Sequence, residues 1–159
     1  PSWRNELEIT DALDNLLKQN NNISFERITD YWKDTGTPED IIHANGEIIK
    51  KMLESSRGNE DQMIGTETVI ESNVKIINPV IIGNNCHISS GSSIGPNVSV
   101  GDNTTISISN IENSIIMKNC KINSTAEIQN SIIANNSEIE DETRNKKIFL
   151  LGEGSKISL

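Results

Sequence analysis

The sequence predicts a mainly β protein: a parallel β-helix of hexapeptide repeats, preceded by a small α/β segment over residues 1–57. Three observations support this prediction. Aliphatic residues recur every six positions from Ile64 onward, isoleucine occurs 27 times in 159 residues, and no aromatic residue occurs from position 33 to 148. A hexapeptide period is typical of a β-helix in which three short sides form one coil. The interior of such a coil is narrow, so a β-branched side chain fits and an aromatic ring does not.

Eight consecutive hexads carry this pattern over residues 64–111, and each begins with isoleucine or valine. The phase breaks after Ile106 and resumes as a 17-residue echo, in which Ile111–Ile116 (IENSII) corresponds to Ile128–Ile133 (IQNSII). Three six-residue sides per coil then predict about four and a half coils over residues 63–142. The fifth position of the hexads holds residues small enough for a tight inner corner: Thr68, Val74, Val80, Cys86, Ser92, Val98 and Thr104.

The chain beyond the repeats is expected to close the β-helix. Residues 140–142 and 144–147 are strongly polar and predict loops, whereas residues 148–151 (IFLL) predict a last strand. We expect this strand to cap the open end, because an uncapped coil would expose unpaired strand edges.

The segment before the repeats predicts two helices with a short strand pair between them. Apolar residues recur at helical spacing from Leu7 to Leu17, and the Asn20–Asn22 run is expected to end that helix. Apolar and polar side chains alternate over residues 23–28, which are β-prone, and with Tyr31 and Trp32 this pattern predicts a short strand pair or hairpin arm. Thr37, followed by proline and two carboxylates, predicts the start of a second helix that continues to about residue 55.

A small polar stretch at residues 55–59 predicts the loop between two domains, 1–57 and 63–159. The net charge of −9 makes nucleic acid or an anionic membrane surface an unfavourable partner. No 18-residue apolar run and no signal-peptide pattern is present. Cys86 and Cys120 are the only cysteines and have no histidine at ligand spacing, so we expect no zinc site, no disulfide and a cytoplasmic location.

Two stretches of the amino-terminal segment resemble the sugar nucleotidyltransferases, specifically the glucose-1-phosphate thymidylyltransferases. These are residues 1–11 (PSWRNELEITD) and residues 31–40 (YWKDTGTPED). The hexads, the paired IxNSII motifs and residues 150–153 (LLGE) resemble the longer members of the family, which append a left-handed β-helix to the catalytic domain. The left-handed sense is implied by this resemblance alone. Asn5 stands where the family usually has glycine.

The resemblance implies an enzyme that joins dTTP to a sugar 1-phosphate and releases pyrophosphate. It covers essentially the whole chain but only the rear part of the family's enzyme, because the Gly-rich nucleotide loop and its catalytic Arg and Lys have no counterpart here. We therefore expect the chain to be the C-terminal portion of a thymidylyltransferase, with no catalytic residue of its own and no activity in isolation. The β-helix would then serve assembly or regulation.

The resemblance also assigns three residues to the substrate and metal sites of the full-length enzyme. Arg4 would contact the sugar phosphate, Glu8 would line the sugar side, and Asp34 would ligate Mg²⁺ together with an aspartate of the missing half. Without the resemblance, Asp34 is simply a turn residue before a capped helix, and Arg4 is a solvated cation.

Two other functions stay open at this stage. The chain can act as a stand-alone β-helix module for oligomerisation or interaction, and a homo-oligomer built through the β-helix is expected in any case. It can also be a hexapeptide acyltransferase, in which His87 on the coil would serve as the general base. The absence of a long loop after the coils argues against acyl transfer.

Overall fold

The computed structural model describes residues 6–55, 62–141, 146–147, 150–151 and 156–158. These residues group into two compact units, residues 1–32 and residues 33–159. Among its described residues, the first unit contains one helix, α1 (Ile9–Lys18). No residue of this helix is buried. The sequence predicted this helix, and it begins two residues later than the apolar spacing suggested.

The strand pair expected over residues 23–32 is wrong, because the structure has no strand between the two helices. The β-prone side chains there are exposed, including Phe25 at 92% and Trp32 at 68%. An isolated two-stranded hairpin is marginal in water without a third strand or a helix to pack on. The alternating apolar side chains of residues 23–32 therefore stay exposed in this structure.

The second helix, α2 (Pro38–Ser55), begins at the predicted residue. The Thr37 hydroxyl accepts a hydrogen bond from the backbone N–H of Asp40 at 3.2 Å, which confirms the predicted cap. Glu39 and Asp40 lie in the first turn, where the positive end of the helix dipole favours carboxylates.

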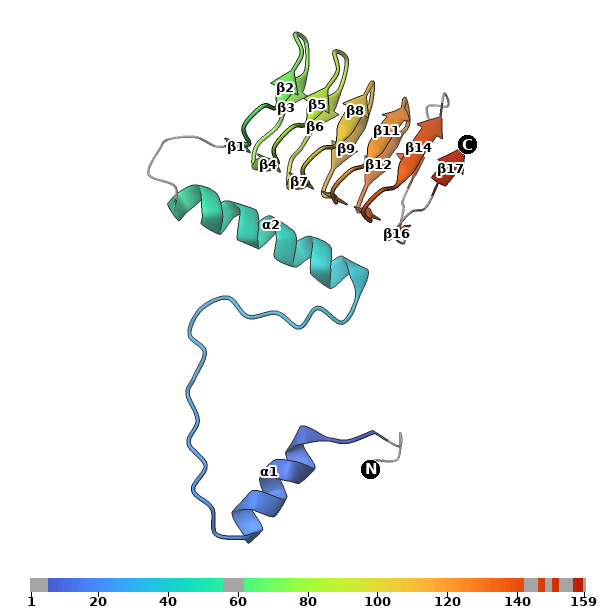
Figure 1. The fold of residues 1–159 in the computed structure, drawn as a ribbon. Coiled ribbons are helices and arrows are strands. Elements are labelled where there is room, and N and C mark those ends of the chain that lie inside the picture. Colours follow the sequence, from blue (N-terminus) through green and yellow to red (C-terminus); the bar gives the residue numbers. More distant parts are fainter. Residues whose placement is uncertain (1–5, 56–61, 142–145, 148–149, 152–155, 159) are drawn as a thin grey trace. The chain divides into compact units, whose positions relative to one another are not determined.

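Three parallel sheets form the β-helix, and their strands alternate along the chain (Figure 1). The architecture is a parallel β-solenoid of about five turns, preceded in the sequence by a small helical segment. This confirms the predicted left-handed β-helix class. Sheet A contains β1 (Gln62–Ile64), β4 (Val80–Ile82), β7 (Val98–Val100), β10 (Ile115–Ile116), β13 (Ile132–Ile133) and β16 (Leu150–Leu151). Sheet B contains β2 (Val69–Ile70), β5 (His87–Ile88), β8 (Thr105–Ser107), β11 (Lys121–Ser124), β14 (Glu138–Asp141) and β17 (Lys156–Ser158). Sheet C contains β3 (Lys75–Ile76), β6 (Ser93–Ile94), β9 (Asn110–Glu112), β12 (Glu127–Gln129) and β15 (Lys146–Lys147).

From Ile82 onward, the first residue of each hexad is buried and pairs in register with an aliphatic residue of the next coil, whereas Ile64 in the first coil is 42% exposed. In sheet B, for example, Ile88 pairs in register with Ile106, and Ile106 with Ile122. All three side chains are at most 1% exposed. This one-dimensional stack of β-branched side chains is the core, and it explains why isoleucine dominates the composition. Cys86 and Cys120 are buried free thiols, as predicted.

The corners of the coils bring asparagine into the left-handed backbone region. Asn85, Asn103, Asn119 and Asn136 have φ between 53° and 61°. Each lies one coil from the next, and their side-chain amides donate along the row, as from Asn103 to Asn119 at 3.1 Å. Asparagine tolerates this conformation better than other residues with a Cβ, so the corners account for part of its abundance.

The polar loops predicted over residues 140–142 and 144–147 are wrong at 140–141 and 146–147, while positions 142 and 144–145 lie outside the described residues. Residues Glu138–Asp141 form β14, and Lys146–Lys147 pair in parallel with Glu127–Ile128. Charged residues are compatible with these strands because one face of each strand points away from the coil. The last predicted strand is confirmed at Leu150–Leu151, which is the final rung of sheet A, while positions 148–149 lie outside the described residues.

Candidate functional site

The predicted substrate residues of the first unit are only partly described. Arg4 lies outside the described residues. Glu8 is half-buried and immediately precedes α1, and its backbone carbonyl accepts a hydrogen bond from the N–H of Asp11 at 3.2 Å. Glu8 and Asp34 belong to different compact units.

Asp34 is exposed and lies in the short segment that leads into α2. The residues on either side of it are tied together. The Lys33 ammonium lies 2.7 Å from Oδ1 of Asp40, and the Thr37 hydroxyl donates to Oδ2 of Asp40 at 2.8 Å. Lys33 and, to a smaller degree, Thr37 lower the pKa of the Asp40 carboxyl below its usual value. This closed network holds the Asp34 segment against the first turn of the helix.

The middle of α2 packs on the β-helix. Ala44, Gly46 and Ile49 are buried, and Ile49 is only 1% exposed. Asn45 joins the helix to sheet A, because its side chain accepts a hydrogen bond from the Ser99 hydroxyl at 2.6 Å. Sequence reasoning missed this contact. The available signal was Gly46, since glycine inside a helix costs stability and often marks a close approach of neighbours.

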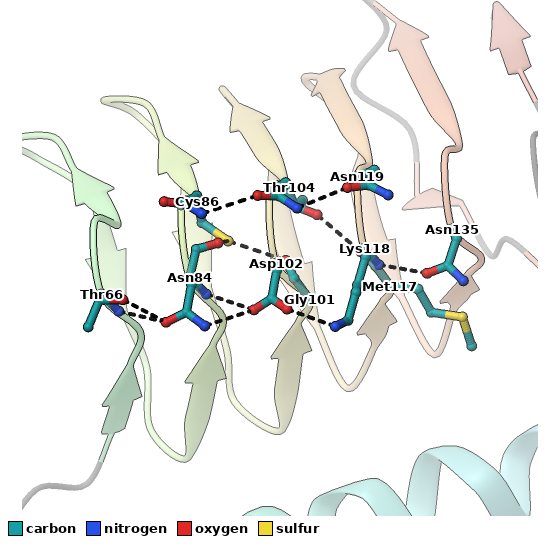
Figure 2. A network of polar contacts seen from close by, with 12 residues as sticks. Thr66, Asn84, Cys86, Gly101, Asp102, Thr104, Met117, Lys118, Asn119 and Asn135 are labelled. Carbon is teal, nitrogen blue, oxygen red and sulfur yellow. Dashed lines mark hydrogen bonds and ion pairs between the residues drawn. The ribbon is translucent and has the colours of Figure 1, made fainter.

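A polar ladder runs along one corner of the β-helix (Figure 2). Oδ1 of Asn84 accepts from the backbone N–H of Thr66 at 2.8 Å, and Oδ1 of Asp102 accepts from the N–H of Asn84 at 2.9 Å. Oδ2 of Asp102 pairs with the Lys118 ammonium at 2.8 Å, and the backbone N–H of Lys118 donates to Asn135. The Lys118 ammonium and the Asn84 amide hold the pKa of Asp102 below its usual value. The ladder satisfies corner amides and therefore stabilises the coil rather than forming a reactive site.

His87 occupies an exposed position on sheet B and pairs with a carboxylate. Its Nε2 lies 2.8 Å from Oε1 of Glu71, and Oε2 of Glu71 accepts from the backbone N–H of Ser90 at 2.8 Å. The Ser90 amide and then His87 lower the pKa of Glu71. A carboxylate that orients an imidazole is the arrangement a general base needs, so the geometry keeps the acyl-transfer alternative open.

Two shallow hollows adjoin each other on the face of sheet C. The first, of about 350 Å³, is lined by Gly91, Ile108, Asn110, Thr125 and Glu127. The second, of about 340 Å³, shares Asn110 and Glu127 with it. Neither is lined by Asp34 or His87, so the sequence-predicted residues are not gathered in these hollows.

Within the described part of the chain, no three His, Cys, Asp or Glu side chains are grouped so as to hold a metal ion. Asp34 can therefore offer Mg²⁺ one carboxylate from this chain. That number fits the ion, because Mg²⁺ is usually bound through one or two carboxylates together with substrate phosphates and water.

Among the described helices, none combines the length and apolar character needed to cross a bilayer.

Comparison with known proteins divides the chain in two. Residues 1–51 match the family model described as Nucleotidyl transferase, and residues 76–158 match the model described as GMPPB C-terminal domain. The chain is 36% identical to a Glucose-1-phosphate thymidylyltransferase of Streptomyces antibioticus, over 100% of this chain and 47% of the relative. It is 34% identical to the Low-salt glycan biosynthesis nucleotidyltransferase Agl11 of Haloferax volcanii, over 100% of this chain and 48% of the relative.

A third similarity is to the Bifunctional protein GlmU of Methanococcus aeolicus, at 35% identity over 77% of this chain and 32% of the relative. The chain spans about half the length of the first two relatives. A helical segment that matches a Nucleotidyl transferase model, followed by a parallel β-helix, defines the class: part of a nucleotidyltransferase-like domain joined to a β-helix. Because its β-helix matches the GMPPB C-terminal domain model over just more than half of the chain, this protein belongs to the sugar nucleotidyltransferase family.

Proposed function

We propose that this chain is the C-terminal part of a glucose-1-phosphate thymidylyltransferase. The observation that carries the proposal is the similarity to the Streptomyces antibioticus enzyme, which covers 100% of this chain and therefore both the helical segment and the β-helix. The similarity to a second Glucose-1-phosphate thymidylyltransferase, from Streptomyces griseus, also covers 100% of the chain, at 28% identity. The proposed reaction joins dTTP and a sugar 1-phosphate, and it releases pyrophosphate and a nucleotide sugar.

In this proposal, an oxygen of the sugar phosphate attacks the α-phosphorus of dTTP, and the bond from that phosphorus to the bridging oxygen of pyrophosphate breaks. Such chemistry depends on positioning and on stabilisation of charge. Arg4 would contact the sugar phosphate and Glu8 would line the sugar side. Asp34 would supply one carboxylate to Mg²⁺, whose charge stabilises the transferring phosphates when it is bound.

The proposal assigns nucleotide binding to residues beyond this chain. The chain alone is therefore expected to release no pyrophosphate from dTTP and glucose 1-phosphate above a blank without protein. We also propose that the β-helix mediates self-association, which sedimentation at tens of micromolar would test, since a monomer would contradict it.

A hexapeptide acyltransferase is the second candidate, and the His87–Glu71 pair is the observation that favours it. A general base acts only beside a bound acyl donor. His87 is exposed and lines neither of the two hollows on sheet C, so we rank this function below nucleotidyl transfer. Unchanged acetyl-coenzyme A consumption in His87→Ala would remove it.

The variant Asp34→Asn tests the metal role in the complete enzyme. It keeps the size of the side chain and the Thr37 cap, but it removes one negative ligand. Loss of charge stabilisation of this kind is worth several kcal/mol, so turnover should fall by about 100-fold or more. Glu39→Gln, at an exposed carboxylate in the first turn of α2, is the matched control and should leave turnover within about twofold. Unchanged turnover in Asp34→Asn would reject the role.

A further inference from the structure

Helix α2 connects the two regions that the family models separate. The nucleotidyltransferase match reaches residue 51, so it includes most of α2, whereas the β-helix match begins at residue 76. The structure nevertheless places α2 in one compact unit with the β-helix. The helix is thus part of the nucleotidyltransferase region by similarity and part of the β-helix unit by packing.

The contact between α2 and the β-helix is close and centred on Asn45. Its Oδ1 accepts from the Ser99 hydroxyl at 2.6 Å, and its Nδ2 lies 3.5 Å from the backbone carbonyl oxygen of Asn97. Next to it, Gly46 approaches the Asn97 side chain so closely that an added Cβ would lie 3.5 Å from Oδ1. Ile49 completes the contact as a fully buried apolar side chain.

The β-helix side of this contact is itself held rigidly. The Asn97 amide donates to Oδ1 of Asn113 at 2.9 Å, and its backbone N–H donates to the carbonyl oxygen of Pro79 at 2.8 Å. Ser99 lies in the middle of β7, between strands β4 and β10. The β-helix therefore offers α2 a fixed support.

The first turn of α2 holds the Asp34 segment. Lys33 and Thr37, on either side of Asp34, both bind the Asp40 carboxylate in the first turn of α2. Any rotation of α2 about its contact with β7 therefore moves the Asp34 segment as well. Asn45 lies seven residues into the helix, about 10 Å from its start, so a pivot of about 6° would displace that start by about 1 Å.

We propose that the β-helix positions Asp34 for Mg²⁺ through α2, and that Asn45 is the positioning residue of this connection. The inference rests on the proposed role of Asp34 and gives the β-helix a part in the reaction. A displacement of about 1 Å in a catalytic site can cost about 100-fold in rate. The docking of α2 is thus tight enough, and near enough to Asp34, to control turnover.

Two substitutions of Gly46 test this contact: Gly46→Leu adds bulk between α2 and β7, and Gly46→Ala is the matched control. In Gly46→Ala the new Cβ would lie 3.5 to 3.7 Å from Asn97 atoms, which is ordinary van der Waals contact. Alanine also suits a helix better than glycine. In Gly46→Leu the larger side chain has no room and should push α2 away from β7. Asn45→Ala is a milder variant that removes both hydrogen bonds without added bulk.

Amide hydrogen exchange on this chain measures the docking directly. Most of the stability of a helix in a protein comes from tertiary packing rather than from helix propensity, so we expect the protection of α2 amides to come mainly from the contact with the β-helix. We expect α2 amides to exchange at least about tenfold faster in Gly46→Leu and about two- to tenfold faster in Asn45→Ala. Strands β4 to β13 should be unchanged in every variant, and Gly46→Ala should match the original protein. Unaltered α2 exchange in both Gly46→Leu and Asn45→Ala would overturn the inference.

Turnover of the complete enzyme then tests the consequence, with Asp34→Asn measured in parallel. Gly46→Leu should lower turnover by about 100-fold and raise the Mg²⁺ concentration needed for half-maximal rate, whereas Gly46→Ala should change neither. If α2 loosens and Asp34→Asn loses activity, but Gly46→Leu and Asn45→Ala keep the original rate and Mg²⁺ dependence, the positioning role is wrong and the proposed function stands. If Asp34→Asn keeps full turnover, the metal role of Asp34 and the positioning role of Asn45 both fail, while the proposed reaction itself stands.

Discussion

Two glycines of the β-helix allow the steric cost of the coil to be separated from the cost of its backbone conformation. Gly91 and Gly95 both have positive φ, at 86° and 106°. A Cβ at Gly91 would meet nothing within 4 Å. A Cβ at Gly95 would lie 1.8 Å from the carbonyl oxygen of Ile77 and 2.8 Å from Cγ2 of Val80. Substituting each by alanine therefore imposes a similar backbone penalty but a clash at one site only.

The expected magnitudes follow from these distances. The left-handed conformation costs alanine about 1 to 2 kcal/mol, reduced by about 0.5 kcal/mol through the stiffer unfolded chain. Gly91→Ala should therefore lower the free energy of unfolding by about 1 kcal/mol. In Gly95→Ala the Cβ must move more than about 1 Å, because carbon–oxygen contacts normally exceed about 3.3 Å.

That movement strains the sheet ladder around Gly95. The N–H of Ile77 donates to the Ile94 carbonyl, and the N–H of Gly95 donates to the Ile111 carbonyl, both at 2.8 Å. Overpacking costs about 1 to 3 kcal/mol and each weakened hydrogen bond about 1 kcal/mol. Gly95→Ala should thus lose at least about 2 kcal/mol more than Gly91→Ala.

Urea unfolding followed by circular dichroism measures this difference. Fluorescence is unsuitable, because the two tryptophans, at positions 3 and 32, lie outside the β-helix. With a urea slope of about 2 kcal/mol per molar, the two midpoints should differ by about 1 M or more. Midpoints that agree within about 0.2 M would refute the argument, since the close approach of Gly95 to Ile77 would then have no energetic consequence.

Three further predictions address the core, the polar corner and the segment between the helices. Ile94 is fully buried, so Ile94→Asp should unfold the β-helix by circular dichroism while Ile94→Val costs only about 1 kcal/mol; a folded Ile94→Asp would contradict the stacked core. Lys118 lowers the pKa of the Asp102 carboxyl in the folded protein below its ordinary value of 3.8. The stabilisation by the charged Asp102 is therefore complete above pH 3.8 and is lost as the pH falls through the lower pKa of the folded state. Asp102→Asn should therefore flatten the fall of the urea midpoint between about pH 5 and 3, and an unaltered pH profile would count against it. Trypsin should first cut at Arg27 or Lys33, in the exposed stretch before α2, and leave a core that includes α2; early cleavage inside the β-helix would argue against this order.

The candidate site was predictable only as far as a local motif reaches. Thr37 and the residues after it predict a helix start from their residue types alone, and the structure confirms the predicted cap by the Thr37 hydroxyl. The role of Asp34 came from resemblance and stays a prediction. The network through Lys33 and Asp40 was not foreseen, because it depends on how the chain turns between positions 33 and 40.

The hexad spacing alone was enough to predict the β-helix, because the core of such a fold is one-dimensional. Each coil repeats the same spacing, so an aliphatic residue every six positions specifies both the strand and its inward face, as Ile88, Ile106 and Ile122 illustrate. The repeat even implied its own small corners, such as Cys86 and Thr104, both of which are buried.

The packing of α2 and the extent of the coil could be learned only from the folded chain. Residues 138–141 and 146–147 are mostly charged and read as polar, yet their backbones continue the parallel ladder. The contact of Asn45 with Ser99 joins residues 54 positions apart, and neither residue has a pattern that identifies the other. Local spacing determines which residues face a core, whereas contacts between separate elements depend on shape and hydrogen-bond partners that come together only in the folded chain.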